Sequence, residues 1–224
     1  MRRPPRYNTR VRRVLVAIVA ALAAAPAGAS AMRIDPAPQP VAPPAVDPPI
    51  DWHHSRAIGK PYAGRLVDGV QLPAEGRDFW TYDWGLRGSP NRPWRRWGTD
   101  RLVRTLLDVL RDYRAAHPDA ARVGIADLSR PHGGRFGKNF GGLGHSSHQN
   151  GLDVDVLYPR LDGREQRAGS PALVDEQLAQ ELVDRFLDAG AVYVFTGPRL
   201  NLRGPRKVVV ELAHHDDHMH VRIR

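Results

Sequence analysis

The chain has 224 residues, contains no cysteine and carries a formal net charge of +9 at pH 7. Six of these charges come from arginines that precede Met32 in a stretch without acidic residues, so residues 32–224 carry a formal charge of only +3. That remainder has no stripe of basic residues of the kind that follows a nucleic-acid backbone, which argues against nucleic-acid binding, whereas a mildly basic surface suits an anionic polymer such as a cell wall.

Residues 1–31 have the composition of an export signal. The arginines form a basic start, an apolar stretch runs from Val14 to Ala25, and small residues around Ala29 and Ala31 offer cleavage sites. The apolar stretch is shorter than the roughly 20 residues that cross a bilayer, so removal is favoured over retention as an anchor. We therefore expect an exported protein, in the periplasm, the cell wall or the medium, that meets a membrane only through this segment.

Residues 32–54 are predicted to be a linker. Seven prolines lie between Pro36 and Pro49, a composition that favours extended polyproline segments and builds no packed core. The folded domain is expected over residues 55–224. Its length is sufficient for core burial to stabilise an exported domain that has no disulfide.

Residues 55–224 are predicted to form an α+β fold in which flanking helices pack against a mostly antiparallel sheet. Thr99 or Asp100 can cap a helix whose apolar residues recur at helical spacing up to Pro118. A second amphipathic helix is expected over residues 171–189. Strands are expected at residues 123–128, 152–156, 191–196, 207–212 and 218–223.

Two of the predicted strands carry histidine or aspartate at alternating positions. Asp153 and Asp155 alternate with aliphatic residues, so both carboxylates are expected on one face of their strand. His218 and His220 are two residues apart in the last strand and therefore also share a face. A metal ligand at His220 would thus have His218 beside it as a helper.

His148 can join these residues, because a turn through Gly151 would bring it back over the strand that contains Asp155. His148, Asp155 and His220 then offer three nitrogen or oxygen ligands, which is the number that a catalytic zinc uses while it keeps one position open. We therefore predict a cleft on the sheet that holds Zn²⁺. Asp153, Asp216 and Asp217 are the candidate acceptors for the outer N–H of a ligating imidazole.

Further polar and aromatic residues are candidates for contacts with a substrate. Arg130 and Arg135 flank a glycine-rich loop, where solvent exposure is the favoured interpretation for both and binding of a substrate carboxylate or an oxyanion by a guanidinium is the functional one. The tryptophans and tyrosine between Trp80 and Trp97 can line a cleft or pack beneath a long loop.

Three segments of the chain resemble the penicillin-insensitive murein endopeptidases, relatives of lysostaphin, the D-alanyl-D-alanine metallopeptidases and hedgehog-type domains. The matching segments are Gly133-Gly134-Arg135-Phe136, residues 144–155 (GHSSHQNGLDVD) and His218-Met219-His220-Val221-Arg222. The likeness extends upstream through Ile58-Gly59 and Trp97-Gly98, so it covers nearly all of residues 55–224. Because Arg135 lies in a matching segment and Arg130 does not, Arg135 is the preferred substrate-binding residue.

The resemblance implies a zinc peptidase that hydrolyses D-alanyl–meso-diaminopimelyl cross-links of peptidoglycan and lacks a serine nucleophile for β-lactams to acylate. Carried over by position, it implies that His148, Asp155 and His220 are zinc ligands. It also implies that His218 and His215 are active-site histidines, and it places His145 in the metal region without deciding whether His145 is a direct ligand.

Departures from the family pattern leave alternatives open. The segment 161–173 is short and has no histidine, whereas family members can carry a further metal-contacting insertion there. A second metal is therefore not expected. The alternative functions are a D,D-carboxypeptidase or dipeptidase of the same superfamily, and a non-catalytic zinc-containing domain that binds the cell wall.

Overall fold

The computed structural model describes residues 44, 46–137 and 145–224. The chain divides after Gln39, and all described residues belong to the second unit, Pro40–Arg224. The predicted export signal and most of the predicted linker lie outside the described residues, as do residues 138–144 of the glycine-rich loop. Within the described part, no helix combines the length and the apolar character needed to cross a membrane.

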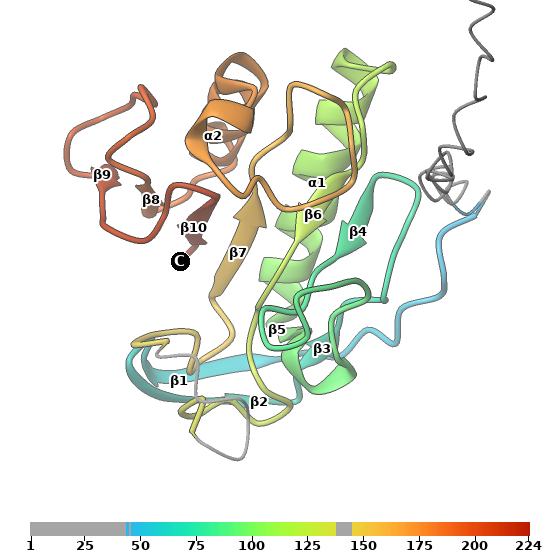
Figure 1. Ribbon diagram of the computed structural model, residues 1–224. Helices are drawn as coiled ribbons and strands as arrows, with labels where there is room; N and C mark the ends of the chain where they lie inside the picture. The colour runs from blue at the N-terminus through green and yellow to red at the C-terminus, as the bar shows by residue number, and fades with distance from the viewer. Residues whose placement is uncertain (1–43, 45, 138–144) are drawn as a thin grey trace, which may run out of the picture. The chain divides into compact units, whose positions relative to one another are not determined.

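A six-stranded sheet in the order β4-β6-β7-β10-β8-β9 forms the centre of the fold (Figure 1). The pairings β6–β7, β7–β10 and β10–β8 are antiparallel, and the outer pairings β4–β6 and β8–β9 are parallel. The strands are β4 Phe79–Thr81, β6 Val123–Ile125, β7 Asp153–Leu157, β8 Tyr193–Thr196, β9 Val209–Glu211 and β10 His218–Arg222. The predicted α+β fold with a mostly antiparallel sheet is confirmed.

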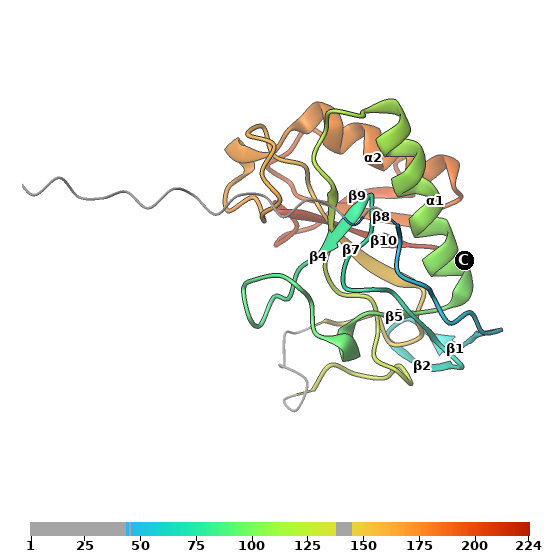
Figure 2. The same ribbon diagram turned by 90° about the vertical axis from the view of Figure 1, so that its right-hand side faces the viewer.

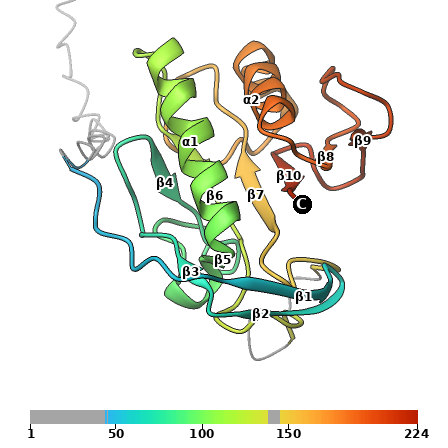
Figure 3. The same ribbon diagram turned by 180° about the vertical axis from the view of Figure 1, so that it is seen from behind.

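Two helices, α1 Asp100–Ala116 and α2 Glu176–Asp188, cover one face of this sheet (Figures 2 and 3). Their buried leucines and valines pack against Val154, Val156, Met219 and Val221, the residues of β7 and β10 that face the helices. The opposite residues of the same two strands, including Asp155 and His220, therefore lie on the face that the helices leave open.

Helix α1 confirms the prediction made from its cap and its periodicity. The Thr99 side chain accepts a hydrogen bond from the backbone N–H of Leu102 over 3.1 Å, and the helix ends before Pro118. Its buried stripe consists of Leu102, Val103, Leu106, Val109, Leu110 and Tyr113. Each such aliphatic side chain contributes roughly 1.5–3 kcal/mol on burial, so this face attaches α1 to the sheet.

The start of the second helix differs from the prediction of a single helix over residues 171–189. Pro171–Leu173 form an isolated 3₁₀ turn, Val174 is extended and buried, and α2 begins only after Asp175. The Asp175 carboxylate accepts a hydrogen bond from the N–H of Leu178 over 3.0 Å. Burial of Val174 in an extended conformation and capping by Asp175 together delay the helix.

Two small sheets support the open face from one side. The first pairs β1 Arg56–Lys60 with β2 Ala63–Val67, and the second pairs β3 Val70–Gln71 with β5 Trp97–Gly98. The turn between β1 and β2 accepts a hydrogen bond at the Pro61 carbonyl from Gln149 N–H over 2.9 Å. This contact fixes the segment that carries His148.

The end of the predicted linker contacts the folded unit. Asp47 accepts a hydrogen bond from the N–H of Arg77 over 2.7 Å, and Ile50 packs against the core. Residues 47–50 therefore follow the surface of the domain before β1 begins at Arg56.

Candidate metal centre

The register of β7 and β10 places Asp155 and His220 side by side. The two strands are antiparallel, and His220 is the direct partner of Asp155. Both side chains are buried on the face away from the helices, as the alternation of the two strands predicts. The carboxylate oxygen Oδ1 of Asp155 lies 3.1 Å from Nδ1 of His220.

His148 reaches the same point from a tight turn before β7. His148 has a φ of 67° and Gly151 a φ of 75°, so the backbone reverses between them. A Cβ at Gly151 would lie 2.8 Å from Cδ1 of Leu66, which leaves glycine as the residue that fits. The turn brings Nε2 of the fully buried His148 to 3.1 Å from Nδ1 of His220 and 3.3 Å from Oδ1 of Asp155.

Each of the two imidazoles uses its other nitrogen on a fixed acceptor. Nδ1 of His148 donates to the carbonyl of Leu128 over 2.7 Å, so its Nε2 keeps a lone pair. Nε2 of His220 donates to Oδ1 of Asp153 over 2.9 Å, which leaves Nδ1 on the inner side. Asp153 also accepts a hydrogen bond from the N–H of His148 over 3.2 Å. Such outer partners set the tautomer and direction of metal-binding histidines.

The three inner atoms suit a divalent cation. Their separations of 3.1, 3.1 and 3.3 Å are close to the roughly 3.3 Å between neighbouring ligands of a tetrahedral ion bound at about 2.0–2.1 Å. The second oxygen of Asp155, Oδ2, is buried and has no hydrogen-bond partner among the described residues. A cation would satisfy the lone pairs of His148 Nε2 and His220 Nδ1 as well as this carboxylate oxygen.

The charges around these residues favour a positive ion. Burial alone would lower the pKa of His220, but Asp153 and Asp155 outweigh it and raise that pKa to about 9. Burial would raise the pKa of Asp155, yet His148, His220 and His218 hold it well below its usual range. Burial lowers the pKa of His148. The carboxylates therefore favour a cation at Nδ1 of His220, and His148 is available as a neutral ligand.

His145 lies at the edge of the same centre. Its Nε2 donates to Oδ2 of Asp127 over 2.6 Å, and its Nδ1 lies 3.9 Å from Oδ2 of Asp155. Nitrogen atoms of His145 and His148 and a carboxylate oxygen of Asp155 also lie within 4.8 Å of one another, close enough to share one ion. His145 can thus be a fourth ligand or a neighbour of the ion.

Asp127 and Arg95 support His145 and were not identified from the sequence. Both side chains are fully buried, and the guanidinium of Arg95 forms a two-point ion pair with the carboxylate of Asp127, one branch of which is Nε to Oδ1 over 2.6 Å. Burial would raise the pKa of Asp127, but His145 and Arg95 hold it below its ordinary value. The one sequence signal was an aspartate inside an otherwise apolar predicted strand, residues 123–128.

His218 lies on the same face as His220 and is held by its chain neighbour. Its Nδ1 donates to Oδ1 of Asp217 over 2.7 Å, and its Nε2 lies 4.0 Å from Oδ1 of Asp155. The ring of Trp84 covers one side, with ring centroids 5.0 Å apart. The arrangement directs Nε2 of His218 towards the three ligand atoms.

His215 lies next to His218, with ring centroids 4.7 Å apart. Its Nδ1 donates to the carbonyl of Ala213 over 2.9 Å. Burial, and then the neighbouring His218, lower the pKa of His215. The side chain of His215 is half-buried.

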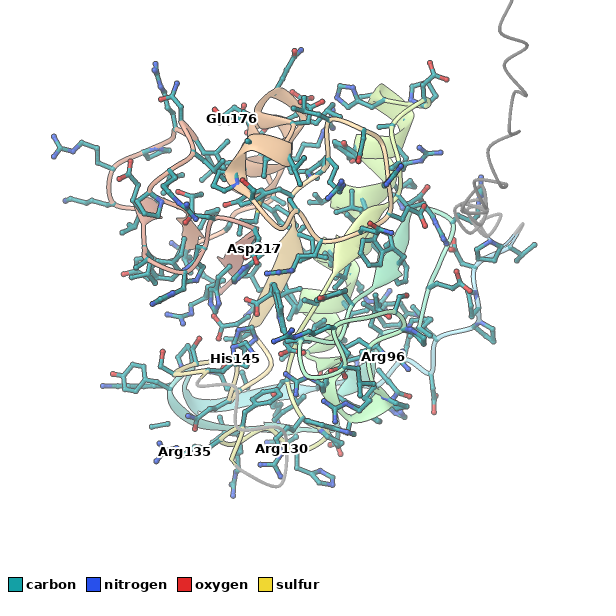
Figure 4. The ribbon with its side chains drawn as sticks, in the orientation of Figure 1. Arg96, Arg130, Arg135, His145, Glu176 and Asp217 are labelled. Atoms are coloured by element: carbon teal, nitrogen blue, oxygen red, sulfur yellow. The ribbon has the colours of Figure 1, made fainter. Side chains whose placement is uncertain are left out.

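A cleft of about 890 Å³ lies over Asp155, His218 and His220. It is lined by His145, Asp155, His215, His218 and His220 together with Tyr62, Trp84, Ser146, Ser147, Phe195, Leu212, Ala213, His214, Asp217 and Arg222. Of the predicted aromatic stretch only Trp84 lines the cleft, whereas Trp80 and Tyr82 are buried against each other. His145 and Asp217 lie on the open side of the sheet (Figure 4).

Arg135, the predicted substrate-binding residue, is exposed and does not line the cleft. Its carbonyl accepts a hydrogen bond from Nη1 of Arg130 over 2.7 Å. In Figure 4 both arginines lie on the loop beyond His145, away from Asp217. A substrate contact of Arg135 stays a prediction.

Comparison with protein families agrees with this site. The model of the penicillin-insensitive murein endopeptidases matches residues 57–189, more than half of the chain. The chain belongs to the penicillin-insensitive murein endopeptidase family. No individual curated protein matches it. The predicted family is thus confirmed, and with it a peptidase function directed at murein, the peptidoglycan of the cell wall.

The matched range contains His145, His148 and Asp155 but ends before β8. His215, His218 and His220 therefore lie outside the part that the family model matches. Strand pairing places His218 and His220 beside Asp155, because β10 pairs directly with β7, and His215 lies next to His218.

Proposed function

We propose that the protein is an exported zinc-dependent endopeptidase that hydrolyses D-alanyl–meso-diaminopimelyl cross-links in peptidoglycan. The observation that carries this proposal is the triangle of His148 Nε2, His220 Nδ1 and Asp155 Oδ1, whose sides measure 3.1 to 3.3 Å. Two imidazoles and one carboxylate form a ligand set of catalytic zinc peptidases. The murein endopeptidase family supplies the substrate class.

Zinc held by these three residues would act as a Lewis acid that polarises the peptide carbonyl and lowers the pKa of water from about 15.7 towards 7. His218 supplies the proton acceptor. Asp217 holds Nδ1–H of His218, so the lone pair of Nε2 faces the centre. A positioned acceptor of this kind contributes roughly 100- to 10,000-fold in rate. His215 offers a second acceptor beside it.

The decisive experiment combines the zinc-loaded protein with cross-linked muropeptides and follows the products by mass spectrometry, with and without a chelator. We expect dimers to be converted into monomers, and the chelator to abolish the reaction. Release of terminal D-alanine alone would identify a carboxypeptidase instead. Unchanged muropeptides together with retained wall binding would identify a non-catalytic domain.

The variant His218→Ala tests the assignment of the proton acceptor. At saturating zinc, its turnover should fall by about 100-fold or more, while its zinc content stays that of the wild type. Near-normal turnover would show that His218 does not accept the proton. His54→Ala, which removes an exposed histidine outside the cleft, is the control.

Export is proposed from residues 1–31 alone. The mature protein, isolated from the cell envelope or the medium, should begin near residue 30 or 32, as N-terminal sequencing would show. Recovery of the full-length chain from the cytoplasm would contradict export.

A further inference from the structure

Arg222 lines the cleft and belongs to the same strand as His218 and His220. It follows His220 by two residues in β10, so its side chain lies on the same face as those of His218 and His220. Its strand partners are Asp153 on β7 and Tyr193 on β8. It is the only lysine or arginine among the described residues that line the cleft.

One end of the Arg222 side chain is fixed. Its Nε donates to Oδ1 of the buried Asp153 over 2.6 Å, and its guanidinium carbon lies 5.7 Å from the ring centroid of Tyr193. The side chain is 17% exposed. Among the described residues, neither Nη nitrogen of Arg222 has a hydrogen-bond partner. The guanidinium is therefore held in place with donors still available.

The hydrogen bond to Asp153 does not use all the N–H donors of Arg222. Asp153 already accepts hydrogen bonds from Nε2 of His220 and from the N–H of His148. The contact with Arg222 uses Nε alone, whereas a guanidinium recognises a carboxylate with two parallel N–H groups. The remaining donors suit an anionic group of a molecule in the cleft.

The position of Arg222 defines where such an anion would lie. Two residues along a strand correspond to about 7 Å, so Arg222 is one short step from the ligand His220. In a peptide bond whose nitrogen comes from an amino acid with a free α-carboxylate, that carboxylate is attached to the carbon next to the scissile nitrogen. Arg222 lines the same cleft as His220, so it is available to such a carboxylate.

We propose that Arg222 binds the free α-carboxylate on the amine side of the scissile amide and thereby selects substrates that carry it. This proposal rests on the proposed endopeptidase function and adds its specificity-determining residue. It also locates carboxylate recognition in the cleft, rather than at the exposed Arg135.

The test compares two cross-linked peptide dimers, one with the free α-carboxylate beside the scissile amide and one with a carboxamide there. The wild-type full chain should cleave the carboxylate substrate with a kcat/KM about 10- to 100-fold higher, mainly through KM. Arg222→Gln should lose this preference, and Arg222→Lys should retain part of it because the positive charge remains.

A matched control is Arg199→Gln, because Nε of Arg199 also pairs with an aspartate, Asp216, over 2.8 Å, yet this side chain is 67% exposed and does not line the cleft. It should keep the preference of the wild type. If Arg222→Gln lowers kcat/KM equally for both dimers, Arg222 only supports Asp153 and the proposal is overturned.

A binding measurement separates this proposal from the proposed function. NMR titration of the metal-free chain with an uncleavable peptide, carrying either the carboxylate or the carboxamide, requires no hydrolysis. Weaker binding of the carboxylate peptide to Arg222→Gln, by about 10-fold or more, supports the role of Arg222 even if no dimer is cleaved. Equal affinities of wild type and Arg222→Gln for that peptide would overturn it.

Discussion

Asp217 holds His218 by a hydrogen bond of 2.7 Å from Nδ1 to Oδ1, and this contact directs Nε2 of His218 towards Asp155. The other carboxylate oxygen of Asp217 pairs with Arg167, which lies in the short segment 161–173. Asp217 is therefore fixed from one side and orients the proposed proton acceptor on the other.

Asp217→Asn should lower kcat by about 10- to 100-fold with little change in KM, because the tautomer and direction of His218 are no longer fixed. The zinc content should stay that of the wild type. Asp216→Asn, which changes the neighbouring aspartate that pairs with Arg199, is the matched control. An Asp217→Asn variant with a normal kcat would contradict the positioning role.

Removing only one partner of the buried ion pair between Arg95 and Asp127 should lower the free energy of unfolding more than removing both. Asp127→Asn leaves the guanidinium of Arg95 buried without its counter-charge and should cost about 3–5 kcal/mol of unfolding free energy. The double variant Arg95→Met/Asp127→Leu should be less destabilised, since no charge remains buried. Chemical denaturation measures both, and equal losses in the two variants would show that the charge is not the cause.

The sequence alone predicted the strands and the helix whose form depends on neighbouring residues. The alternation in Asp153–Leu157 and in His218–Arg222 set the buried and open faces of β7 and β10 correctly. The cap at Thr99 and the helical spacing that follows it predicted α1. In these elements, periodicity and capping act within a few residues, so tertiary contacts reinforce the local preference.

The features that were missed depend on contacts between distant segments. Arg95 and Asp127 are 32 residues apart, and neither segment alone indicates that a buried guanidinium meets a carboxylate. The late start of α2 reflects the cap at Asp175 together with the bridge between Arg160 and Val174, and this bridge is also a tertiary contact. The sequence predicted that Asp155 and His220 come together, but the register that sets them directly opposite each other comes from strand pairing across 65 residues.

Zinc should stabilise the folded chain, and a chelator should remove this effect. A ligand at about 100 times its Kd adds about 2.7 kcal/mol to the unfolding free energy, so the Tm should rise on addition of zinc. His148→Ala, Asp155→Asn and His220→Ala should each abolish the rise, whereas His54→Ala should retain it. A zinc-induced rise that survives in His220→Ala would remove His220 from the ligand set.

Asp83, which is distant in sequence from the proposed metal ligands, should make a pH-dependent contribution to the free energy of unfolding. Its buried carboxylate accepts hydrogen bonds from Nε and Nη2 of Arg92 over 2.6 and 2.9 Å and from the N–H groups of Gly85 and Leu86. Burial would raise the pKa of Asp83, but the Arg92 guanidinium and the backbone donors lower it below 3.8. The folded state therefore binds this proton less tightly than the unfolded state.

This pKa difference predicts that the contribution of Asp83 is complete above the ordinary aspartate pKa of 3.8 and is lost as the pH falls from there through the lower folded-state value. Asp83→Asn should cost about 1.5–3 kcal/mol at pH 7, because hydrogen bonds to a charged group are replaced by weaker ones. Urea denaturation of both proteins between pH 7 and 3 should show the gap between them narrowing at acid pH. The control Asp108→Asn, on the exposed side of α1, should differ little from the wild type in unfolding free energy, and this difference should not narrow at acid pH. A wild-type advantage over Asp83→Asn that stays constant down to pH 3 would mean that the carboxylate has the same pKa in the folded and unfolded states.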